Sequence, residues 1–232
     1  MGHLQIPLLR HLQQDSLLNL ISLELDKLSQ QQISNSLGLS TDEKPDAAFA
    51  IAYSGDCIFL KYYVREASVQ ARYRNTHDPV YKDSCVEFFI AFQGEREYYN
   101  LEFNCLGTCR AGFGPDRHNR KLLHPATVSK IRRFASLRAG NTTSPLKTWH
   151  LTLAIPASAF SEHSFASLEK VQASGNFYKC GDELPVPHFL AWNQLQTSTP
   201  NFHLPEFFGS LQFLPTEYQM EENHTSLQFF KA

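Results

Sequence analysis

The sequence lacks an excess of either charge, a long apolar segment and the features of an export signal. It has 21 Lys and Arg against 23 Asp and Glu, a formal net charge of -2, so no general positive field would attract nucleic acid or an anionic membrane surface. No apolar run is long enough to cross a bilayer. Asp15, Asn19 and Glu24 interrupt the early apolar runs, unlike in a signal peptide. We therefore expect no nucleic-acid or membrane partner and, for the sequence as given, a cytoplasmic location.

The sequence also has few cysteines and methionines, and they do not follow the patterns of metal and haem sites. The five cysteines are an odd number without an export signal, so we expect free thiols in a reducing compartment. The spacing of Cys105 and Cys109 is wider than in most structural zinc pairs, and no second pair follows. Haem ligation by methionine is disfavoured because only Met1 and Met220 exist, both near the ends. The spacing therefore predicts no metal site and no haem site.

What the sequence does contain is a short helical pattern followed by alternating ones. After Asp15, a candidate N-cap, leucine and isoleucine recur every three or four residues, which predicts a short amphipathic helix; the positions are Leu17, Leu20, Ile21, Leu25 and Leu28. From residue 47 onward the period becomes two. Residues 57–66 and 149–156 alternate as half-buried strands do, and Pro156 ends the second.

Further short strands are predicted near residues 128–138, 176–180, 188–193 and 209–213. Loops rich in Gly, Pro, Asn and Ser separate them, and no helical periodicity lies between them. We therefore predict an all-β fold, an antiparallel β-sandwich or jelly roll with a short N-terminal helix, formed as one domain over residues 1–232. The basic segment 116–134 is interpreted as a solvated loop leading into a strand, because Phe134 is its single aromatic residue.

A hairpin over residues 84–104 is predicted to place two glutamates side by side. Each of its strands has one apolar side and one polar side, and both apolar sides reach the same core only in certain registers. A tight turn centred on Gly94 and Glu95 pairs Phe92 with Glu97, which sets Glu87 opposite Glu102. Like charges about 5 Å apart are destabilising, so something should compensate for them.

Three explanations compete for this glutamate pair. Lys61 or Arg65, on the non-core face of another strand, neutralises it; the two carboxyls share a proton or a cation; or they accept hydrogen bonds from a ligand. Tyr98, Asn100 and Asn104 share the polar side. This mixture of ring, amide and carboxylate suits a polyhydroxylated ligand, because hydroxyls need donors and acceptors and sugar C–H faces pack on rings.

The segment 176–209 is stiffened by four prolines, Pro185, Pro187, Pro200 and Pro205. Such a loop can hold Trp192, His188, His203 and Phe208 in fixed positions. They either line a site or close the end of the sandwich.

Four stretches, VYKDSCVEFFIAF, YYNLEFNCLG, NFYKCGDELPVPHFLAWN and NFHLPEFFGSLQF, support a family assignment when taken together. Between residues 45 and 213 the chain resembles the family-9-like carbohydrate-binding proteins, related to family-9 carbohydrate-binding modules. The resemblance implies a β-sandwich with a sugar slot between two aromatic rings. Glu87 matches the family's Glu, Tyr81 stands where the first ring is normally Trp, and Trp192 matches the second ring. The family's Arg has no clear match; Arg110 is a guess.

The leading prediction is a non-catalytic carbohydrate-binding protein linked to polysaccharide catabolism, with a mono- or oligosaccharide as its partner, that acts either alone or beside a separate glycoside hydrolase. The predicted ligand-binding residues are Tyr81, Glu87, Tyr98, Asn100, Glu102, Asn104, Trp192 and His203. The resemblance makes calcium a candidate cofactor, with Asp83 and Asp182 as isolated candidate ligands.

Two alternatives stay open. Carboxyls about 5 Å apart have the spacing found in retaining glycoside hydrolases, so Glu87 and Glu102 are also candidates for acid/base and nucleophile. Against this, a polar face would not raise the pKa of either carboxyl. A purely structural interaction domain is the other alternative, and it would leave the polar side of the hairpin without a ligand.

Overall fold

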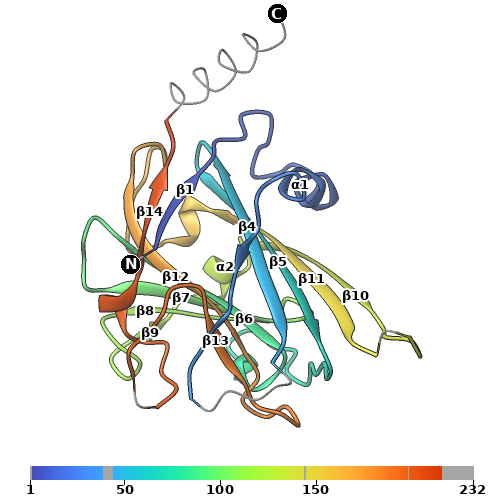
Figure 1. The fold of residues 1–232 in the computed structure, drawn as a ribbon. Helices are drawn as coiled ribbons and strands as arrows, with labels where there is room; N and C mark the ends of the chain where they lie inside the picture. Colours follow the sequence, from blue (N-terminus) through green and yellow to red (C-terminus); the bar gives the residue numbers. More distant parts are fainter. Residues whose placement is uncertain (1, 39–43, 144, 198, 216–232) are drawn as a thin grey trace, which may run out of the picture.

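The computed structural model describes residues 2–38, 44–143, 145–197 and 199–215 of the protein. Two β-sheets pack face to face, and their strands cross at an angle (Figure 1). The predicted β-sandwich is therefore confirmed. Within the described residues, no helix combines the length and apolar character needed to cross a membrane.

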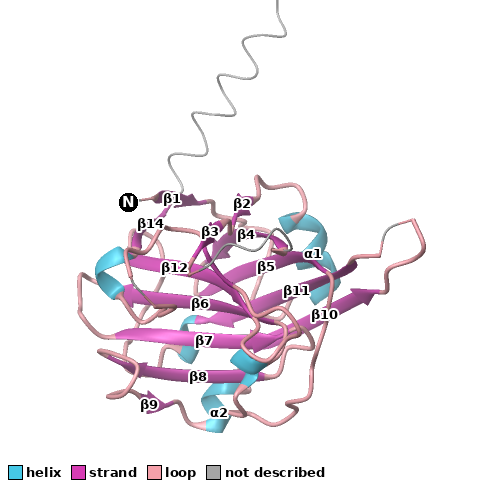
Figure 2. Ribbon diagram, turned by 60° about the horizontal axis from the view of Figure 1, so that its bottom comes forward, coloured by secondary structure: helices cyan, strands magenta, loops and turns pink. Residues whose placement is uncertain are grey.

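Sheet A has nine strands among the described residues and is seen from its outer side in Figure 2. Its order is β1 (His3–Ile6), β14 (Gly209–Phe213), β12 (Gln172–Cys180), β6 (Cys85–Phe92), β7 (Tyr98–Asn104), β8 (Cys109–Gly114) and β9 (Lys121–Leu122), and β13 (Phe189–Ala191) joins β12 to β3 (Asn35–Ser36). Most neighbours are antiparallel as predicted, but β1 and β14 are parallel. This pair brings the first described residues beside the last strand.

Sheet B has five strands among the described residues. Its order is β10 (Arg132–Arg138), β11 (Lys147–Pro156), β5 (Cys57–Glu66), β4 (Asp46–Ser54) and β2 (Gln31–Gln32). The alternation in β5 and β11 places one set of side chains in the core between the sheets, as predicted; these include Ile58, Leu60, Tyr62, Val64, Leu151, Leu153 and Ile155. The period of two thus fixed which face of each strand is buried.

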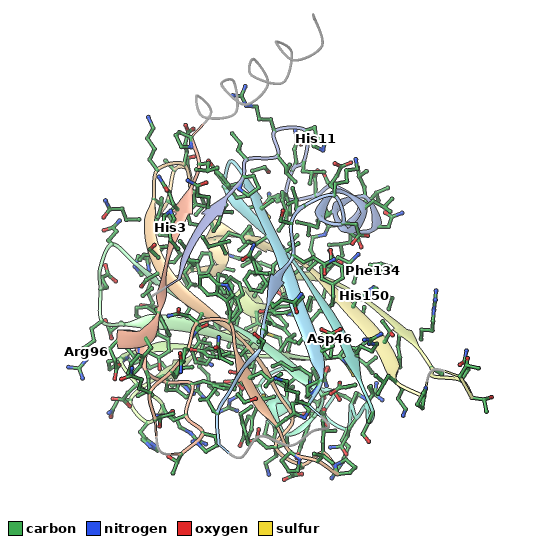
Figure 3. The ribbon with its side chains drawn as sticks, in the orientation of Figure 1. His3, His11, Asp46, Arg96, Phe134 and His150 are labelled. Atoms are coloured by element: carbon green, nitrogen blue, oxygen red, sulfur yellow. The ribbon has the colours of Figure 1, made fainter. Side chains whose placement is uncertain are left out.

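Helix α1 (Leu18–Leu25) lies against the outer face of sheet B, and Phe134 and His150 lie beside it (Figure 3). The helix is shorter than its apolar pattern suggested. Leu17 is the N-cap and makes no side-chain capping bond, so the predicted cap at Asp15 is wrong. Ile21 and Leu25 are buried, whereas Leu17 and Leu20 are exposed. The buried stripe is narrower than predicted because the helix touches the sheet along one edge only.

In the part of the chain that the structure describes, four short helical segments connect strands. They are α2 (Pro125–Val128) and the 3₁₀ turns η1 (Val80–Lys82), η2 (Ala157–Ala159) and η3 (Pro205–Phe207). Turn η1 precedes β6, and η3 precedes β14, so both lie next to sheet A. With the segment between β13 and β14 they cover the outer face of that sheet, where a second apolar cluster includes Phe89, Tyr178, Phe202 and Phe208.

Candidate functional site

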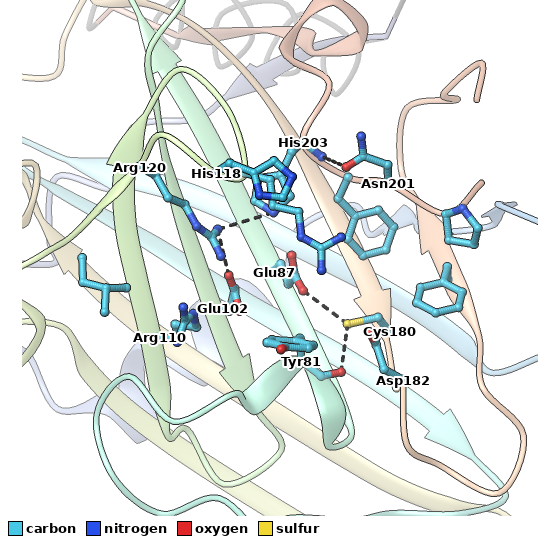
Figure 4. A pocket seen from close by; sticks show the side chains of 15 residues that line it. Tyr81, Glu87, Glu102, Arg110, His118, Arg120, Cys180, Asp182, Asn201 and His203 are labelled. Carbon is cyan, nitrogen blue, oxygen red and sulfur yellow. Dashed lines mark hydrogen bonds and ion pairs between the residues drawn. The ribbon is translucent and has the colours of Figure 1, made fainter. Parts of the chain in front are cut away.

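A pocket of about 360 Å³ opens on the outer face of sheet A (Figure 4). Strands β6, β7, β8 and β12 contribute its floor, and η1, the β8–β9 loop and the segment before η3 contribute its walls. It is lined by Tyr81, Glu87, Glu102, Arg110, Arg117, His118, Arg120, Leu122, Cys180, Asp182, Phe189, Pro200, Asn201, Phe202 and His203. Of the eight predicted ligand-binding residues, Tyr81, Glu87, Glu102 and His203 are brought together here.

The predicted glutamate pair exists and is buried in the floor of this pocket. Glu87 and Glu102 are direct partners in the β6–β7 ladder, and their relative exposures are 3% and 2%. The register is as predicted, but the turn is centred one residue earlier, because Glu95 N–H donates to the Phe92 carbonyl. Gln93 and Gly94, with φ of 54° and 76°, adopt the left-handed conformations that such a hairpin turn requires.

Arg120 from the β8–β9 loop compensates for the charge of this pair. Its Nη1 lies 3.2 Å from Glu102 Oε1, which also accepts a 2.7 Å hydrogen bond from Asn100 Nδ2. The expectation that Lys61 or Arg65 would do this is wrong. Both lie on sheet B, where they pair with Asp26 and Asp46, respectively. The outer faces of a sandwich point in opposite directions, so these cations are on the far side of the molecule.

The two carboxyls differ in how readily each loses its proton. Burial raises the pKa of Glu87 well above its usual value, and the neighbouring charge of Glu102 raises it further. Burial also raises the pKa of Glu102, but Arg120 and Arg110 oppose that shift. We therefore expect Glu87 to keep its proton where Glu102 is ionised. The sequence argument that a polar face leaves both pKa values unshifted is wrong, because loops cover this face.

Glu87 is held from the β12 side of the pocket. Its Oε1 accepts a hydrogen bond from the thiol of Cys180 at 3.3 Å. Asp182, two residues further along, also lines the pocket, and burial raises its pKa to about 6. The floor thus contains three carboxyl groups in a confined, partly covered space.

The β8–β9 loop carries three of the lining residues, Arg117, His118 and Arg120. Asp116 shapes this loop by accepting hydrogen bonds from the backbone N–H groups of His118 and Asn119. Gly114 is required beside it, because an added Cβ would lie 2.6 Å from Arg120 Cα. Segment 116–134 is largely exposed and leads into β10, as predicted, but its first residues also line the pocket, which was not predicted from the sequence. The cluster of basic residues was the signal for them in the sequence.

Arg110 lies on β8 directly opposite Glu102 and also lines the pocket. Its Nη1 donates a 2.7 Å hydrogen bond to the carbonyl of His77, which leaves other guanidinium donors of Arg110 for a ligand. The guess that the family's arginine is Arg110 stays a prediction, and Arg120 is a second residue of the same kind at the site.

Tyr81 lies on one side of the pocket, across from His118 and His203 (Figure 4). His203 Nδ1 is 2.8 Å from the Tyr98 hydroxyl, and its Nε2 is 3.4 Å from Arg120 Nη1. Burial and the nearby Arg120 lower the pKa of His203 to about 3, so its ring is neutral. Arg120 only donates, so the ring proton lies on Nδ1 and Tyr98 accepts it. Tyr98 thereby positions His203 without lining the pocket.

Three other predicted site residues do not line the pocket either. Asn100 lies behind Glu102 and donates to it. Asn104 has a structural role, because its Nδ2 donates to Asp83 and its Oδ1 accepts the N–H groups of Leu106 and Thr108. Trp192 is turned toward the core.

The indole of Trp192 makes edge contacts with Phe49 and Phe177, at centroid distances of 6.1 and 5.8 Å. It also rests on Gly2 and Gly209, where an added Cβ would come within 3.0 and 2.6 Å of its ring. The structure therefore does not bring Trp192 opposite Tyr81. The sequence predicted a strand near residues 188–193 that includes Trp192, whereas β13 ends at Ala191 and Trp192 follows it, and no sequence pattern showed to which side its ring turns.

Comparisons with known proteins match this architecture. A family model described as carbohydrate-binding family 9 matches residues 17–213. The chain belongs to carbohydrate-binding family 9. The family predicted from the sequence is thus confirmed, and with it carbohydrate binding at the level of the family. A search of curated proteins finds no match.

Solved structures with the family 9 fold include three similar chains. A Bacteroides uniformis protein proposed to bind carbohydrate is 34% identical, with a TM-score of 0.80 over 91% of this chain and 98% of its own. A family 9 module from Caldicellulosiruptor kristjanssonii in complex with glucose is 9% identical, with a TM-score of 0.55 over 91% and 95%. Its cellotriose complex is 8% identical, with a TM-score of 0.56 over 92% and 94%. At such low identity the modules show the shared fold alone.

The two carboxyls that the family 9 resemblance offers as candidate calcium ligands have different surroundings. Asp83 is buried, and its carboxylate accepts the backbone N–H groups of Arg72 and Tyr73 and the amide of Asn104. It therefore orders a loop. Asp182 belongs to no group of three or more His, Cys, Asp or Glu side chains close enough to share an ion, within the residues described. Calcium takes six to eight oxygen ligands, which include backbone carbonyls and water, so calcium binding near Asp182 stays a prediction.

Proposed function

We propose that this family 9 protein binds one end of a saccharide in the pocket on the outer face of sheet A and does not cleave it. The observation that carries this proposal is the convergence of paired carboxyls, guanidinium groups and a tyrosine ring at one pocket. Its volume of about 360 Å³ is near the lower end of the roughly 300–1,000 Å³ range of small-molecule sites. This favours one or two sugar rings over a long chain segment.

The lining groups supply complementary hydrogen bonds for sugar hydroxyls. Glu102 accepts, Arg117 and Arg120 donate, and a protonated Glu87 does both. Tyr81 offers a ring on which the C–H face of a sugar packs. The complexes of the Caldicellulosiruptor modules with glucose and cellotriose make β-linked glucose the first ligand class to try here.

One observation favours a second candidate, a glycoside hydrolase. Glu87 has the raised pKa of a general acid and stands directly opposite Glu102, whose ionised form Arg120 and Arg110 favour. Against it, Glu102 is held by both Arg120 and Asn100, and these bonds lower its nucleophilicity. Membership of a carbohydrate-binding family favours binding. The binding proposal includes a separate glycoside hydrolase that acts on the polysaccharide to which this protein binds.

The test is calorimetric titration with glucose, cellobiose, cellotriose and matched xylo- and manno-oligosaccharides, followed by an assay for released reducing ends. Glu102→Gln should weaken binding about 10- to 100-fold, because a charge-assisted hydrogen bond contributes about 1.5–3 kcal/mol. Glu24→Gln on α1 is the matched control and should bind as the wild type does. No heat with any sugar would overturn the binding proposal. Sugar release lost in Glu87→Gln would establish the hydrolase instead.

A further inference from the structure

Two thiols and a carboxyl group meet beneath the pocket. Cys85 begins β6 and Cys180 ends β12, and the two are direct partners in the ladder between these strands. Glu87 follows on the same face of β6. One ligand atom from each of the three side chains lies within 4.8 Å of the other two, and all three residues are buried. Within the residues described, this is the group of metal-ligating side chains that is close enough to share an ion.

We propose that Cys85, Cys180 and Glu87 bind a zinc ion. Zinc prefers four tetrahedral ligands at about 2.3 Å for sulfur and about 2.0–2.2 Å for carboxylate oxygen. Such ligands stand roughly 3.5 Å apart, close to the observed 3.3 Å between Cys180 Sγ and Glu87 Oε1. Small side-chain rotations therefore suffice to form the site. Two thiolates and one oxygen select zinc over calcium or magnesium, which require oxygen ligands.

The fourth ligand position faces the pocket. Cys180 and Glu87 both line it, whereas Cys85 lies behind them. Three protein ligands with a fourth position open to solvent is the arrangement of reactive or ligand-binding zinc sites, rather than of closed structural ones. A water molecule or a hydroxyl group of a small ligand would complete the coordination.

The local charges are compatible with a divalent cation. In the described chain, no ion pair joins a Lys, Arg or His nitrogen to the Glu87 carboxylate within 4.0 Å, and Arg120 pairs with Glu102 instead. Asp182 adds a further carboxyl to the same pocket. Two thiolates and one carboxylate carry three negative charges against the two positive charges of zinc, and Arg117, which also lines the pocket, opposes the remaining negative charge.

The experiment needs no sugar, so its failure is distinct from failure of the proposed function. Tag-free, fully reduced protein is titrated with Co²⁺, which reports thiolate ligation by a charge-transfer band, and then with Zn²⁺, which should displace it. Zinc should also raise the Tm and release about two protons or more, since thiols must ionise to bind. Absence of both the band and the Tm rise would overturn the proposal.

Variants assign the ligands. Cys85→Ser and Glu87→Gln should each weaken zinc binding more than about tenfold, since even residues that only orient metal ligands contribute 10–100-fold. Cys57→Ser is the matched control, because Cys57 is also a buried free thiol but lies on sheet B under α1. Equal zinc affinity in Cys85→Ser and Cys57→Ser would place the ion elsewhere. Should Cys85→Ser not fold, Glu87→Gln decides, because a zinc affinity equal to that of the wild type in this variant would overturn the proposal.

Discussion

The outer faces of the two sheets are both covered, but a helix covers sheet B without leaving a pocket, whereas loops cover sheet A and enclose one. On sheet B, α1 packs Ile21 and Leu25 against Ala50, Ala52 and Phe59, which closes the face. On sheet A, loops fold over the polar side of the β6–β7 hairpin and leave a pocket floored by buried carboxyls. A regular helix with an apolar stripe excludes water, whereas irregular loops with charged side chains can enclose a hydrated site.

The ion pairs of the two faces differ in the same way. Arg120 and Glu102 have side-chain exposures of 11% and 3%. Lys61 is equally buried on sheet B, but its partner Asp26 is 43% exposed and remains solvated. The first pair has little water to replace a lost partner, and the second has water on one side. Four predictions follow from this contrast, in decreasing order of effect.

Removing the Phe59 side chain tests the closed face. Phe59 is fully buried, so Phe59→Ala should lower the free energy of unfolding by about 3–5 kcal/mol. Saccharide affinity should stay within about twofold, because distant sites act independently. Urea denaturation and calorimetric titration measure the two effects. A comparable loss of affinity would mean that the two faces are coupled.

Removing each cation tests the difference between the ion pairs. Arg120→Met leaves the buried Glu102 carboxylate unpaired and should cost about 3 kcal/mol of stability. Lys61→Met should cost less than about 1 kcal/mol, since Asp26 stays in water. Urea denaturation of both variants makes the comparison, and adding Glu102→Gln to Arg120→Met should recover stability. Equal losses in the two single variants would contradict the distinction.

The pH dependence of stability tests the proton on Glu87. Its pKa in the folded state is raised above the unfolded value, so the folded protein binds the extra proton and stability falls as pH rises toward the folded pKa. The slope approaches about -1.4 kcal/mol per pH unit for one proton. Glu87→Gln should make the slope less negative by up to this amount above the usual glutamate pKa, as measured by urea denaturation of both proteins at a series of pH values.

The difference between the two slopes separates Glu87 from other titrating groups. The pKa of Asp182 is raised to about 6, those of His203 and His188 are lowered to about 3 and about 4, and burial raises the pKa values of the cysteines. These groups are present in both proteins, so their contributions largely cancel in the difference. A slope unchanged by Glu87→Gln would show that Glu87 ionises normally.

Replacing each of the two rings that were predicted to stack on the sugar, Tyr81 and Trp192, should give the smallest effect. Tyr81→Ala should weaken saccharide binding about fivefold, because aromatic packing contributes about 1 kcal/mol. Trp192→Phe should leave affinity unchanged and lower the Tm instead, since this ring packs on Phe49 and Phe177. Calorimetric titration and thermal unfolding of both variants measure this. The reverse outcome would restore Trp192 to the site.

Several strands were predictable because the sequence patterns that indicate them lie within each strand or hairpin. Alternation over residues 57–66 and 149–156 identified the buried faces of β5 and β11. In the hairpin, both apolar sides reach the same core only in certain registers, and the predicted register correctly paired Glu87 with Glu102. The turn itself was predicted one residue too late in the sequence. The motifs around Glu87 and His203 were sufficient to identify the family.

The contents of the pocket depended on the tertiary structure. Asp83, Asn104 and Trp192 were chosen for their chemistry, but each is used for loop order or core packing. Conversely, Arg120 was assigned to a solvated loop and binds Glu102. The direction of a loop side chain depends on segments far away in the chain, so no local pattern encodes it.

The sequence by itself determined the alternating strands over residues 57–66 and 149–156, the paired glutamates and membership of carbohydrate-binding family 9, because periodicity and register are properties of neighbouring residues. Only the tertiary structure decided which cation balances those glutamates, which ring faces the pocket, and that Cys85 and Cys180 meet beside Glu87. These contacts join separate strands and loops, and they form when the two sheets and their covering segments pack.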